Sequence, residues 1–280
     1  MRIAILGAGG QLGRALGRRL PHWGHAPLML MGERWDITDP LVVAQLVDLA
    51  PGGIINAAAM TNVDGCERDP ARAFRVNGLG AEHVARAAAE LGVPLVHVST
   101  DYVFDGATDA PYREEAATNP LSVYGASKLD GERRALAAYP QAQVARTAWL
   151  YGLGGRHFVG RILELADERG ALSVVTNEVG NPTFADDLAD AMGQLITRSV
   201  GGVFHLVNEG YASRYELARA VLTASGRANI PVTPADSFPR AAKPPAFAPL
   251  ANTRAAALGI RLRPWQAALG AYLAMVEELG

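Results

Sequence analysis

The chain has one cysteine, almost no net charge and no apolar run long enough to cross a bilayer. Cys66 cannot form an intramolecular disulfide and lacks nearby partners for a metal site, so we expect a reducing compartment and no bound metal. The formal net charge of -2 gives no general electrostatic reason to expect a nucleic acid or an anionic membrane as partner. The apolar start over residues 1–6 is too short for a signal peptide. A soluble, cytoplasmic protein is expected.

Short apolar runs and helical patterns alternate through the first half of the chain. The expected strands cover residues 2–6, 28–31, 53–56, 94–99 and 143–147, and the expected helices cover residues 11–20, 41–50, 71–91 and 124–138. Continuous apolar strands that alternate with helices are typical of a parallel sheet covered on both faces. The sequence therefore predicts an α/β fold with a doubly wound, Rossmann-like parallel sheet.

A looser pattern follows Trp149. Further helices are expected at 158–168, 186–197, 213–225 and 264–279, and a further strand at 202–206. The proline-rich stretch 231–249 is expected to be an ordered wrapping loop rather than a linker, because a helix still follows it. We expect a sheet domain over 1–150, to which 180–207 return, and a smaller, interleaved lobe over 151–179 and 208–280.

Three glycines, Gly7, Gly10 and Gly13, lie where the first expected strand ends and the first expected helix begins. Glycine at such a junction permits a tight turn, lets a pyrophosphate approach the backbone and lets the helix pack closely on the strand. The free N–H groups at the helix start favour a phosphate. The turn therefore predicts a dinucleotide cofactor and makes residues 1–150 an NAD(P)-binding domain.

Two side chains about 20 residues beyond this turn leave the type of cofactor open. Glu33 could bind the hydroxyls of the adenosine ribose, as expected for NAD, whereas Arg34 could bind the 2′-phosphate of NADP. The expected cofactor is therefore NADPH or NADH, and the sequence does not decide between them.

Tyr124 and Lys128 are four residues apart on an expected helix and therefore share one face. A phenol with its ordinary pKa of about 10 gives or takes a proton poorly at neutral pH, and a nearby ammonium can lower that pKa by roughly one to three units. We therefore expect a catalytic pair rather than a solvated helix face. Ser99 and Thr100 end the preceding strand, at the sheet edge where such folds bind ligands, and either hydroxyl could contact a substrate oxygen.

The glycine spacing G-x-x-G-x-x-G resembles that of the extended short-chain dehydrogenase/reductase superfamily. The phrases that resemble the dTDP-4-dehydrorhamnose reductase family, over nearly the whole chain, are 56–64, 99–106, 120–125, 131–132, 146–152, 180–183 and 202–206. The pair Thr100 and Asp101 distinguishes this family from the sugar-nucleotide epimerases, which usually have a serine there. The resemblance implies NAD(P)H-dependent reduction of the C4 keto group of dTDP-4-dehydro-L-rhamnose to dTDP-L-rhamnose, with Tyr124 as the proton donor.

The resemblance also implies roles for individual residues. The catalytic residues would be Thr100, Tyr124 and Lys128, and Thr100 is preferred to Ser99 because the family pattern has its hydroxyl there. The residues implied to bind the cofactor are Gly7, Gly10, Gln11, Leu12, Glu33, Arg34, Asp36, Ile37, Ala57, Ala58, Ala59, Tyr124 and Lys128. The residues implied to bind the substrate are Thr61, Val63, Thr100, Asp101, Phe104, Tyr124, Trp149, Asn181 and Lys243. The expected partner is thus a nucleotide sugar, and a homodimer is left open.

Three of these residues have structural alternatives. Asp36 could belong to the cap of the helix that follows it, although Thr38 and Asp39 fit that position better. Trp149 could be a core residue, and Asn181, which precedes a proline, could only begin a turn.

Two phrases depart from the family pattern. Residues 241–247 replace its usual arginine-proline phrase, and residues 177–178 replace its usual aspartate-glutamine. Lys243 can neutralise a phosphate but cannot donate two parallel hydrogen bonds as arginine does. Because these phrases lie where the nucleotide diphosphate would bind, a reductase of another nucleotide-linked 4-keto sugar stays open. A non-catalytic NADP-binding regulatory subunit also stays open, although the intact catalytic residues argue against it.

Overall fold

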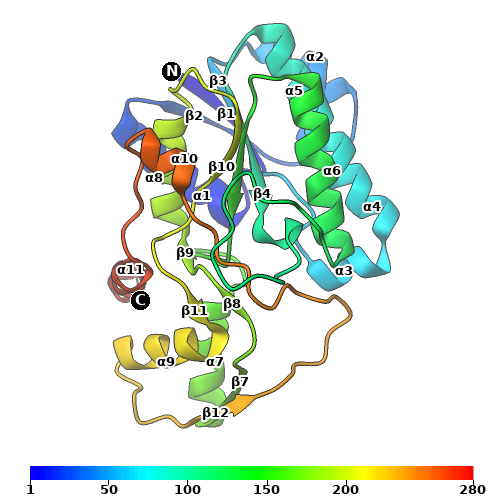
Figure 1. Ribbon diagram of the computed structural model, residues 1–280. Helices are drawn as coiled ribbons and strands as arrows, with labels where there is room; N and C mark the ends of the chain where they lie inside the picture. The colour runs from blue at the N-terminus through cyan, green and yellow to red at the C-terminus, as the bar shows by residue number, and fades with distance from the viewer. Residues whose placement is uncertain (280) are drawn as a thin grey trace.

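A six-stranded parallel sheet forms the centre of the computed structural model, which describes residues 1–279 (Figure 1). Its strands are β1 (Arg2–Leu6), β2 (Ala26–Leu30), β3 (Gly53–Asn56), β4 (Leu95–Thr100), β5 (Gln143–Thr147) and β10 (Gly202–His205). Their order across the sheet is β10-β5-β4-β3-β1-β2. The order reverses beside β1, and α/β sheets bind ligands outside the carboxyl ends of the strands at such a reversal.

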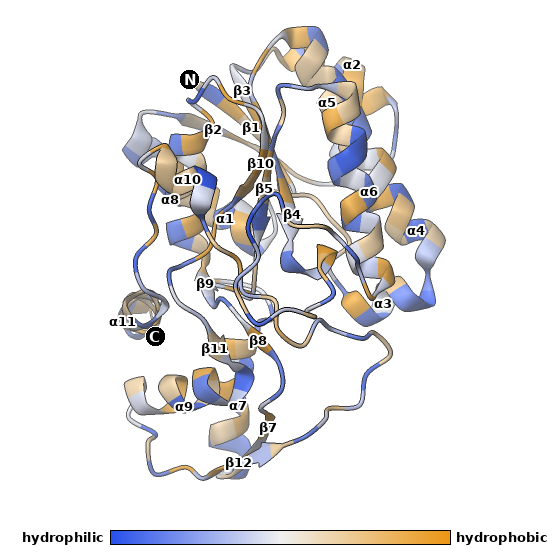
Figure 2. Cartoon of the chain, in the orientation of Figure 1, coloured by the Kyte–Doolittle hydropathy of each residue, from blue (hydrophilic) through white to orange (hydrophobic). Residues whose placement is uncertain are grey.

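Helices cover both faces of this sheet. On one face lie α2 (Leu41–Leu49), α5 (Gly80–Leu91) and α6 (Val123–Ala138), and on the other lie α1 (Gln11–Arg19) and α8 (Ala185–Leu195) (Figure 1). Figure 2 shows hydrophobic and hydrophilic residues alternating along α5 and α6, as expected for helices with one buried side. The doubly wound α/β fold predicted from the sequence is confirmed.

A smaller lobe packs around its own hydrophobic core. It contains α7 (Phe158–Arg169), α9 (Arg214–Ala224), α11 (Trp265–Leu279) and a two-stranded parallel sheet of β7 (Leu172–Val175) and β12 (Val232–Ala235). Two further strand pairs lie near the junction with the sheet domain: β6 (Leu150–Tyr151) with β9 (Thr183–Phe184), and β8 (Val179–Gly180) with β11 (Ala212–Ser213). Between these lobe segments the chain returns to the central sheet, because α8 packs on α1 and β10 pairs with β5.

Three differences from the expected elements exceed a shift of one or two residues at an end. The helix expected at 71–91 is divided into α4 (Pro70–Phe74), a π-helical turn η3 (Arg75–Leu79) and α5. The proline-rich stretch, which was expected to be a loop throughout, contains the strand β12. The segment that follows it includes α10 (Thr253–Ala257), whose Ala255 packs in the core beside the sheet rather than in the smaller lobe.

The remaining short elements are η1 (Leu20–Trp23), η2 (Glu33–Trp35), α3 (Val63–Arg68) and η4 (Asp101–Val103). Within residues 1–279, no helix combines the length and the apolar character that crossing a bilayer requires.

Candidate active site

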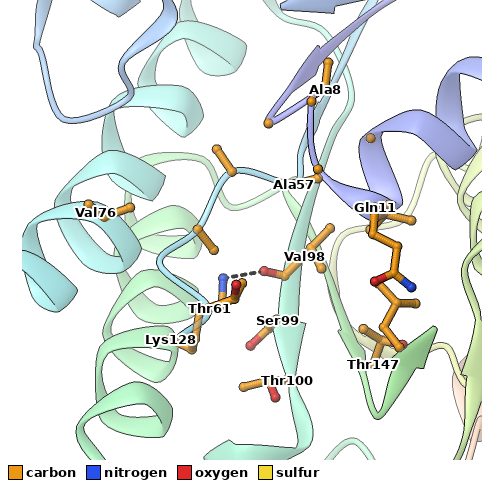
Figure 3. A pocket seen from close by; sticks show the side chains of 18 of the residues that line it. Ala8, Gln11, Ala57, Thr61, Val76, Val98, Ser99, Thr100, Lys128 and Thr147 are labelled. Carbon is orange, nitrogen blue, oxygen red and sulfur yellow. Dashed lines mark hydrogen bonds between the residues drawn. The ribbon is translucent and has the colours of Figure 1, made fainter. Parts of the chain in front are cut away.

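A cleft of about 730 Å³ opens at the carboxyl ends of the sheet strands (Figure 3). Its walls come from the turn after β1, the loops after β2 and β3, the ends of β4 and β5, and the first turns of α6 and α9. Segments far apart in the sequence therefore meet in one cavity, which is where a doubly wound sheet binds its ligand.

The glycine turn after β1 has the geometry that the sequence predicts. Gly7 has φ +74°, and a Cβ on it would lie 2.6 Å from the backbone nitrogen of Ala58. A Cβ on Gly13 would lie 2.5 Å from the Gly7 carbonyl oxygen, so α1 packs directly on the turn. Gly10 precedes α1, and no side chain within residues 1–279 caps the start of this helix. Its first N–H groups thus face a cleft that fits a dinucleotide pyrophosphate.

The loop after β2 brings only some of the expected adenosine-binding residues to the cleft. Asp36 and Ile37 line it, whereas Glu33 and Arg34 lie on the exposed surface of η2 and are not among its lining residues in the described chain. The Asp36 carboxylate accepts a hydrogen bond from the backbone N–H of Thr38. Neither side chain at positions 33 and 34 is oriented by an enclosed site, so the structure leaves both choices of cofactor open.

The loop after β3 lines the cleft with small side chains. Ala57, Ala58, Ala59 and Thr61 of this loop and Val63 at the start of α3 all line the cleft, as expected for side chains that leave room for a ring and a ribose.

Two buried asparagines hold the loop after β3 in place. Asn56 accepts a hydrogen bond from the Ala58 N–H at 3.2 Å, and Asn77 accepts one from the Met60 N–H at 2.8 Å. Asn77 lies in the π-helical turn and also donates to Ser127 Oγ in α6 at 2.9 Å. The sequence analysis missed both asparagines; the signal for Asn77 was a polar residue at a buried position of an otherwise apolar helix face.

Thr100 and Asp101 lie at the end of β4, and both are buried in the cleft wall. The Thr100 hydroxyl donates to Asp101 Oδ1 at 2.9 Å. Burial raises the pKa of the Asp101 carboxyl to about 6, and the bond from Thr100 opposes this shift. Ser99 donates its hydroxyl to Glu132, which forms a buried ion pair with Arg146, so its side chain serves the packing between β4, β5 and α6.

Tyr124 and Lys128 project from the first turns of α6 toward Thr100. Lys128 Nζ donates to the Val98 carbonyl oxygen at 2.6 Å, the bond drawn as a dashed line in Figure 3, and burial lowers its pKa to about 8. Burial raises the pKa of the Tyr124 phenol above its usual value, and the neighbouring Thr100 side chain opposes this effect. The phenol is therefore protonated at neutral pH, although a raised pKa also makes it a weaker acid. That Lys128 lowers this pKa stays a prediction.

Trp149 lines the cleft in a conformation rare for its residue type, with φ +45°. The guanidinium carbon of Arg214 lies 3.6 Å from the centre of the Trp149 ring, in a cation–π contact. Arg214 is the first residue of α9 and also lines the cleft, and burial lowers its pKa to about 10. Sequence reasoning missed Arg214. The available signal was a cation at a helix start, where the helix dipole disfavours positive charge.

A family model described as RmlD substrate binding domain matches residues 1–278. The chain belongs to the dTDP-4-dehydrorhamnose reductase family.

Individual relatives agree with this assignment. The chain is 43% identical to the dTDP-4-dehydrorhamnose reductase of Mycobacterium tuberculosis, over 98% of this chain and 92% of that protein. It is 41% identical to a probable dTDP-4,6-dihydroxy-2-methyloxan-3-one 4-ketoreductase of Streptomyces antibioticus, over 96% of this chain and 93% of that protein. The crystal structure of the Bacillus anthracis dTDP-4-dehydrorhamnose reductase in complex with NADP matches with a TM-score of 0.93 and 33% identity, over 98% of both chains.

Two residues that the family resemblance implied as substrate contacts lie elsewhere. Phe104 is fully buried, stacked on Tyr112 with 4.1 Å between ring centres, so its ring fills a core and does not reach the cleft. Asn181 is also buried: its Oδ1 accepts from the Leu250 N–H at 2.7 Å and its Nδ2 donates to the Gly210 carbonyl oxygen at 2.8 Å. Asn181 thus joins three loop segments, and the contacts of both side chains within residues 1–279 are structural.

Lys243 lines a second cavity, of about 390 Å³, in the loops of the smaller lobe. Its neighbours there include Glu178 and Arg240, which form an ion pair. Glu178 also pairs with Arg214 of the main cleft, with 3.6 Å between Oε2 and Nε. The pair of Glu178 and Arg214 therefore joins the lining of one cavity to that of the other.

Proposed function

We propose that this protein reduces the C4 keto group of dTDP-4-dehydro-L-rhamnose to the alcohol, forming dTDP-L-rhamnose, with NADPH or NADH as the reductant. The observation that carries the proposal is the meeting of Thr100, Tyr124 and Lys128 in the cleft that also contains the glycine turn. Family membership and the names of the relatives support the same reaction. The NADP in the Bacillus anthracis relative supports a nicotinamide dinucleotide, which fits the glycine turn and the unpaired Gln11 amide in the cleft.

In this reaction the bound reduced nicotinamide supplies a hydride to the keto carbon. Tyr124 donates its phenolic proton to the keto oxygen as the negative charge develops there. In the free protein the Thr100 hydroxyl donates its hydrogen to Asp101 Oδ1, so Thr100 binds the keto oxygen by turning that hydrogen from Asp101 to the substrate. Lys128 holds the nicotinamide ribose: an ammonium has three N–H donors, and the bond to Val98 uses one of them.

The substrate would bind in the part of the cleft that the cofactor leaves free. Trp149 and Arg214 form the wall nearest to the smaller lobe, where an aromatic face suits a sugar ring and a buried guanidinium suits a phosphate. Arg214 pairs with Glu178, which lines the second cavity. We propose that Lys243 and Arg240 of that cavity contact the nucleotide.

A second candidate is a reductase of another dTDP-linked 4-keto sugar. It is favoured by the 41% identity to the Streptomyces antibioticus ketoreductase and by a lysine where the family usually has arginine. Both candidates use the same catalytic residues and differ only in the sugar that the Trp149 wall accepts.

The deciding experiment supplies purified protein with enzymatically prepared dTDP-4-dehydro-L-rhamnose and, separately, NADPH and NADH. We expect oxidation of the nicotinamide and formation of dTDP-L-rhamnose, and the ratio of the two rates identifies the preferred cofactor. Oxidation only with a different 4-keto sugar would establish the second candidate. Cofactor binding without oxidation of any keto sugar would favour the regulatory alternative.

A cytoplasmic location and a homodimer belong to the proposal as well. A cytoplasmic location follows from the reducing compartment that Cys66 suggests and from a nucleotide-sugar substrate, and cell fractionation tests it. Sedimentation of the purified protein with and without NADPH tests the homodimer.

A further inference from the structure

Two buried polar atoms on one side of the cleft have no hydrogen-bond partner within residues 1–279. They are Nε2 of Gln11 and Oγ1 of Thr147, and both side chains line the cleft. Buried polar groups in proteins are nearly always hydrogen-bonded. The two atoms therefore indicate a ligand group that supplies both an acceptor and a donor.

The two residues come from different elements, a helix and a strand, but face the same region. Thr147 is the last residue of β5, and it lies opposite Thr100 in the pairing of β5 with β4. Gln11 is the first residue of α1, directly after the glycine turn. In Figure 3 the Gln11 amide extends away from α1 toward the end of β5 that carries Thr147. A Cβ on Gly152 would lie 3.4 Å from Gln11 Nε2, so the loop after β6 flanks the amide from the other side.

The order of residues along the cleft shows which part of a dinucleotide reaches this point. Asp36 and Ile37 line the end near β2, the glycine turn lies in the middle, and Thr100 lies beyond it on β4. β5 is the next strand after β4 in the sheet. An adenine at the β2 end and a pyrophosphate at the glycine turn therefore bring the nicotinamide beside Thr100 and Thr147.

We propose that Gln11 and Thr147 bind the carboxamide of the nicotinamide, with Gln11 Nε2 donating to its oxygen and Thr147 Oγ1 accepting from its nitrogen. A primary carboxamide supplies the acceptor and the donor that the two orphaned atoms require. Binding at this group limits rotation of the nicotinamide ring, so the two residues position the ring beside Thr100. The assignment rests on the proposed nicotinamide-dependent function.

The test measures binding of NADP⁺ and of 2′-phospho-ADP-ribose, which ends before the nicotinamide, by titration calorimetry. Thr147→Val keeps the shape and removes the acceptor. We expect it to weaken NADP⁺ binding roughly tenfold, the usual effect of one lost hydrogen bond, and to leave binding of 2′-phospho-ADP-ribose unchanged. Thr147→Ser, which keeps a hydroxyl, should retain most of the affinity for NADP⁺.

An analogue separates the two hydrogen bonds. The 3-acetylpyridine analogue of NADP⁺ keeps the carbonyl oxygen but has a methyl group in place of the amide nitrogen. Thr147→Val should therefore not weaken its binding further, whereas Gln11→Met should weaken binding of the analogue and of NADP⁺ alike.

Three results would overturn the assignment. In the first, both variants bind NADP⁺ as the wild type does. In the second, both variants lose affinity for 2′-phospho-ADP-ribose equally. In the third, only the KM for the nucleotide sugar rises, which would assign the two atoms to the sugar and leave the proposed reaction intact. Wild-type protein that binds no dinucleotide would overturn the proposed function together with the assignment.

Discussion

At the residue scale, burial keeps the Tyr124 phenol protonated and makes it a weaker acid than a phenol in water. Its ring packs edge-on against Tyr102, with 5.4 Å between ring centres, and burial raises the pKa of its phenol. Lys128 lies one helical turn further along α6, and its ammonium donates to the Val98 carbonyl oxygen at 2.6 Å. A protonated phenol beside Thr100 is suited to reduction, in which the keto oxygen must receive a proton.

Tyr124→Phe removes this proton donor and leaves the ring packing in place. We expect kcat to fall by about 10²–10⁴-fold, the usual contribution of a general acid, while the dissociation constant of NADPH changes little. Steady-state assays and titration of cofactor fluorescence check the two quantities. A Phe variant that retains wild-type turnover would remove Tyr124 from the proton transfer.

Titration of the Asp101 carboxyl should make the free energy of unfolding depend on pH. Burial raises the pKa of its carboxyl from 3.8 to about 6. Between these values the folded protein binds a proton that the unfolded chain releases, so the free energy of unfolding falls as the pH rises from about 4 to 6. The expected loss is at most about 3 kcal/mol.

Asp101→Asn is the matched control, because an amide does not titrate. Urea unfolding of both proteins at intervals between pH 4 and pH 7 measures the difference. We expect the wild type to lose stability relative to the variant over this window. Parallel curves would show that the carboxyl keeps its ordinary pKa in the folded protein.

At the scale of the element, α6 takes part in three ion pairs, and two of them differ strongly in burial. Glu132 and Arg146 form a buried pair at 2.7 Å that joins α6 to β5. Asp130 and Arg134 form an exposed pair, also at 2.7 Å, between successive turns of the same helix. The first pair keeps the helix that carries Tyr124 fixed against the sheet.

Substitution of one acid from each pair compares buried and exposed charge on one helix. Glu132→Ala leaves the Arg146 guanidinium buried without its partner and should cost about 3–5 kcal/mol of stability. Asp130→Ala should cost under about 1 kcal/mol. Denaturant unfolding measures both, and Glu132→Gln, which keeps the shape, replaces Glu132→Ala if that variant does not fold. Equal losses at both positions would mean that burial does not decide the contribution of these pairs.

The elements that could be predicted from the sequence are those whose local pattern agrees with their tertiary surroundings. The glycine turn, the strands of the central sheet and the helix from Tyr124 onward all have such agreement. β12 could not be predicted, because Pro234 argues against a strand and the strand depends on tertiary contacts, above all its pairing with β7. The roles of Phe104 and Asn181 could not be predicted either, since their partners Tyr112 and Leu250 are set by the tertiary fold.

The loop that carries Lys243 offers a test of the second cavity. Lys243 is exposed in the second cavity, and the ion pair of Glu178 with Arg214 lies between it and the main cleft. In the proposed complex it therefore contacts the nucleotide and not the reacting sugar. Lys243→Ala should raise the KM for the nucleotide sugar roughly tenfold with little change in kcat, as expected when binding is lost equally from ground and transition states. Lys243→Arg should keep the low KM. An unchanged KM in Lys243→Ala would remove this residue from the site.

At the scale of the whole molecule, the two cavities lie in different parts of the fold, and we propose that cofactor and nucleotide sugar together occupy both. The glycine turn and the loops after β2 and β3 belong to the sheet domain, whereas the second cavity is built from loops of the smaller lobe. Trp149 and Arg214 stand between them. Cofactor and nucleotide sugar should therefore protect different segments of the chain.

Amide hydrogen exchange measures this division directly. Saturating NADPH should slow exchange over residues 7–13, 30–37 and 57–63, because these segments line the main cleft. Addition of dTDP should slow exchange over residues 177–178 and 236–246, which line the second cavity. α2 lies outside both cavities, and its exchange should respond only to the general gain in stability that either ligand produces. If dTDP protects only the sheet-domain segments, the nucleotide binds within the main cleft, and Lys243 and Arg240 have no part in holding it.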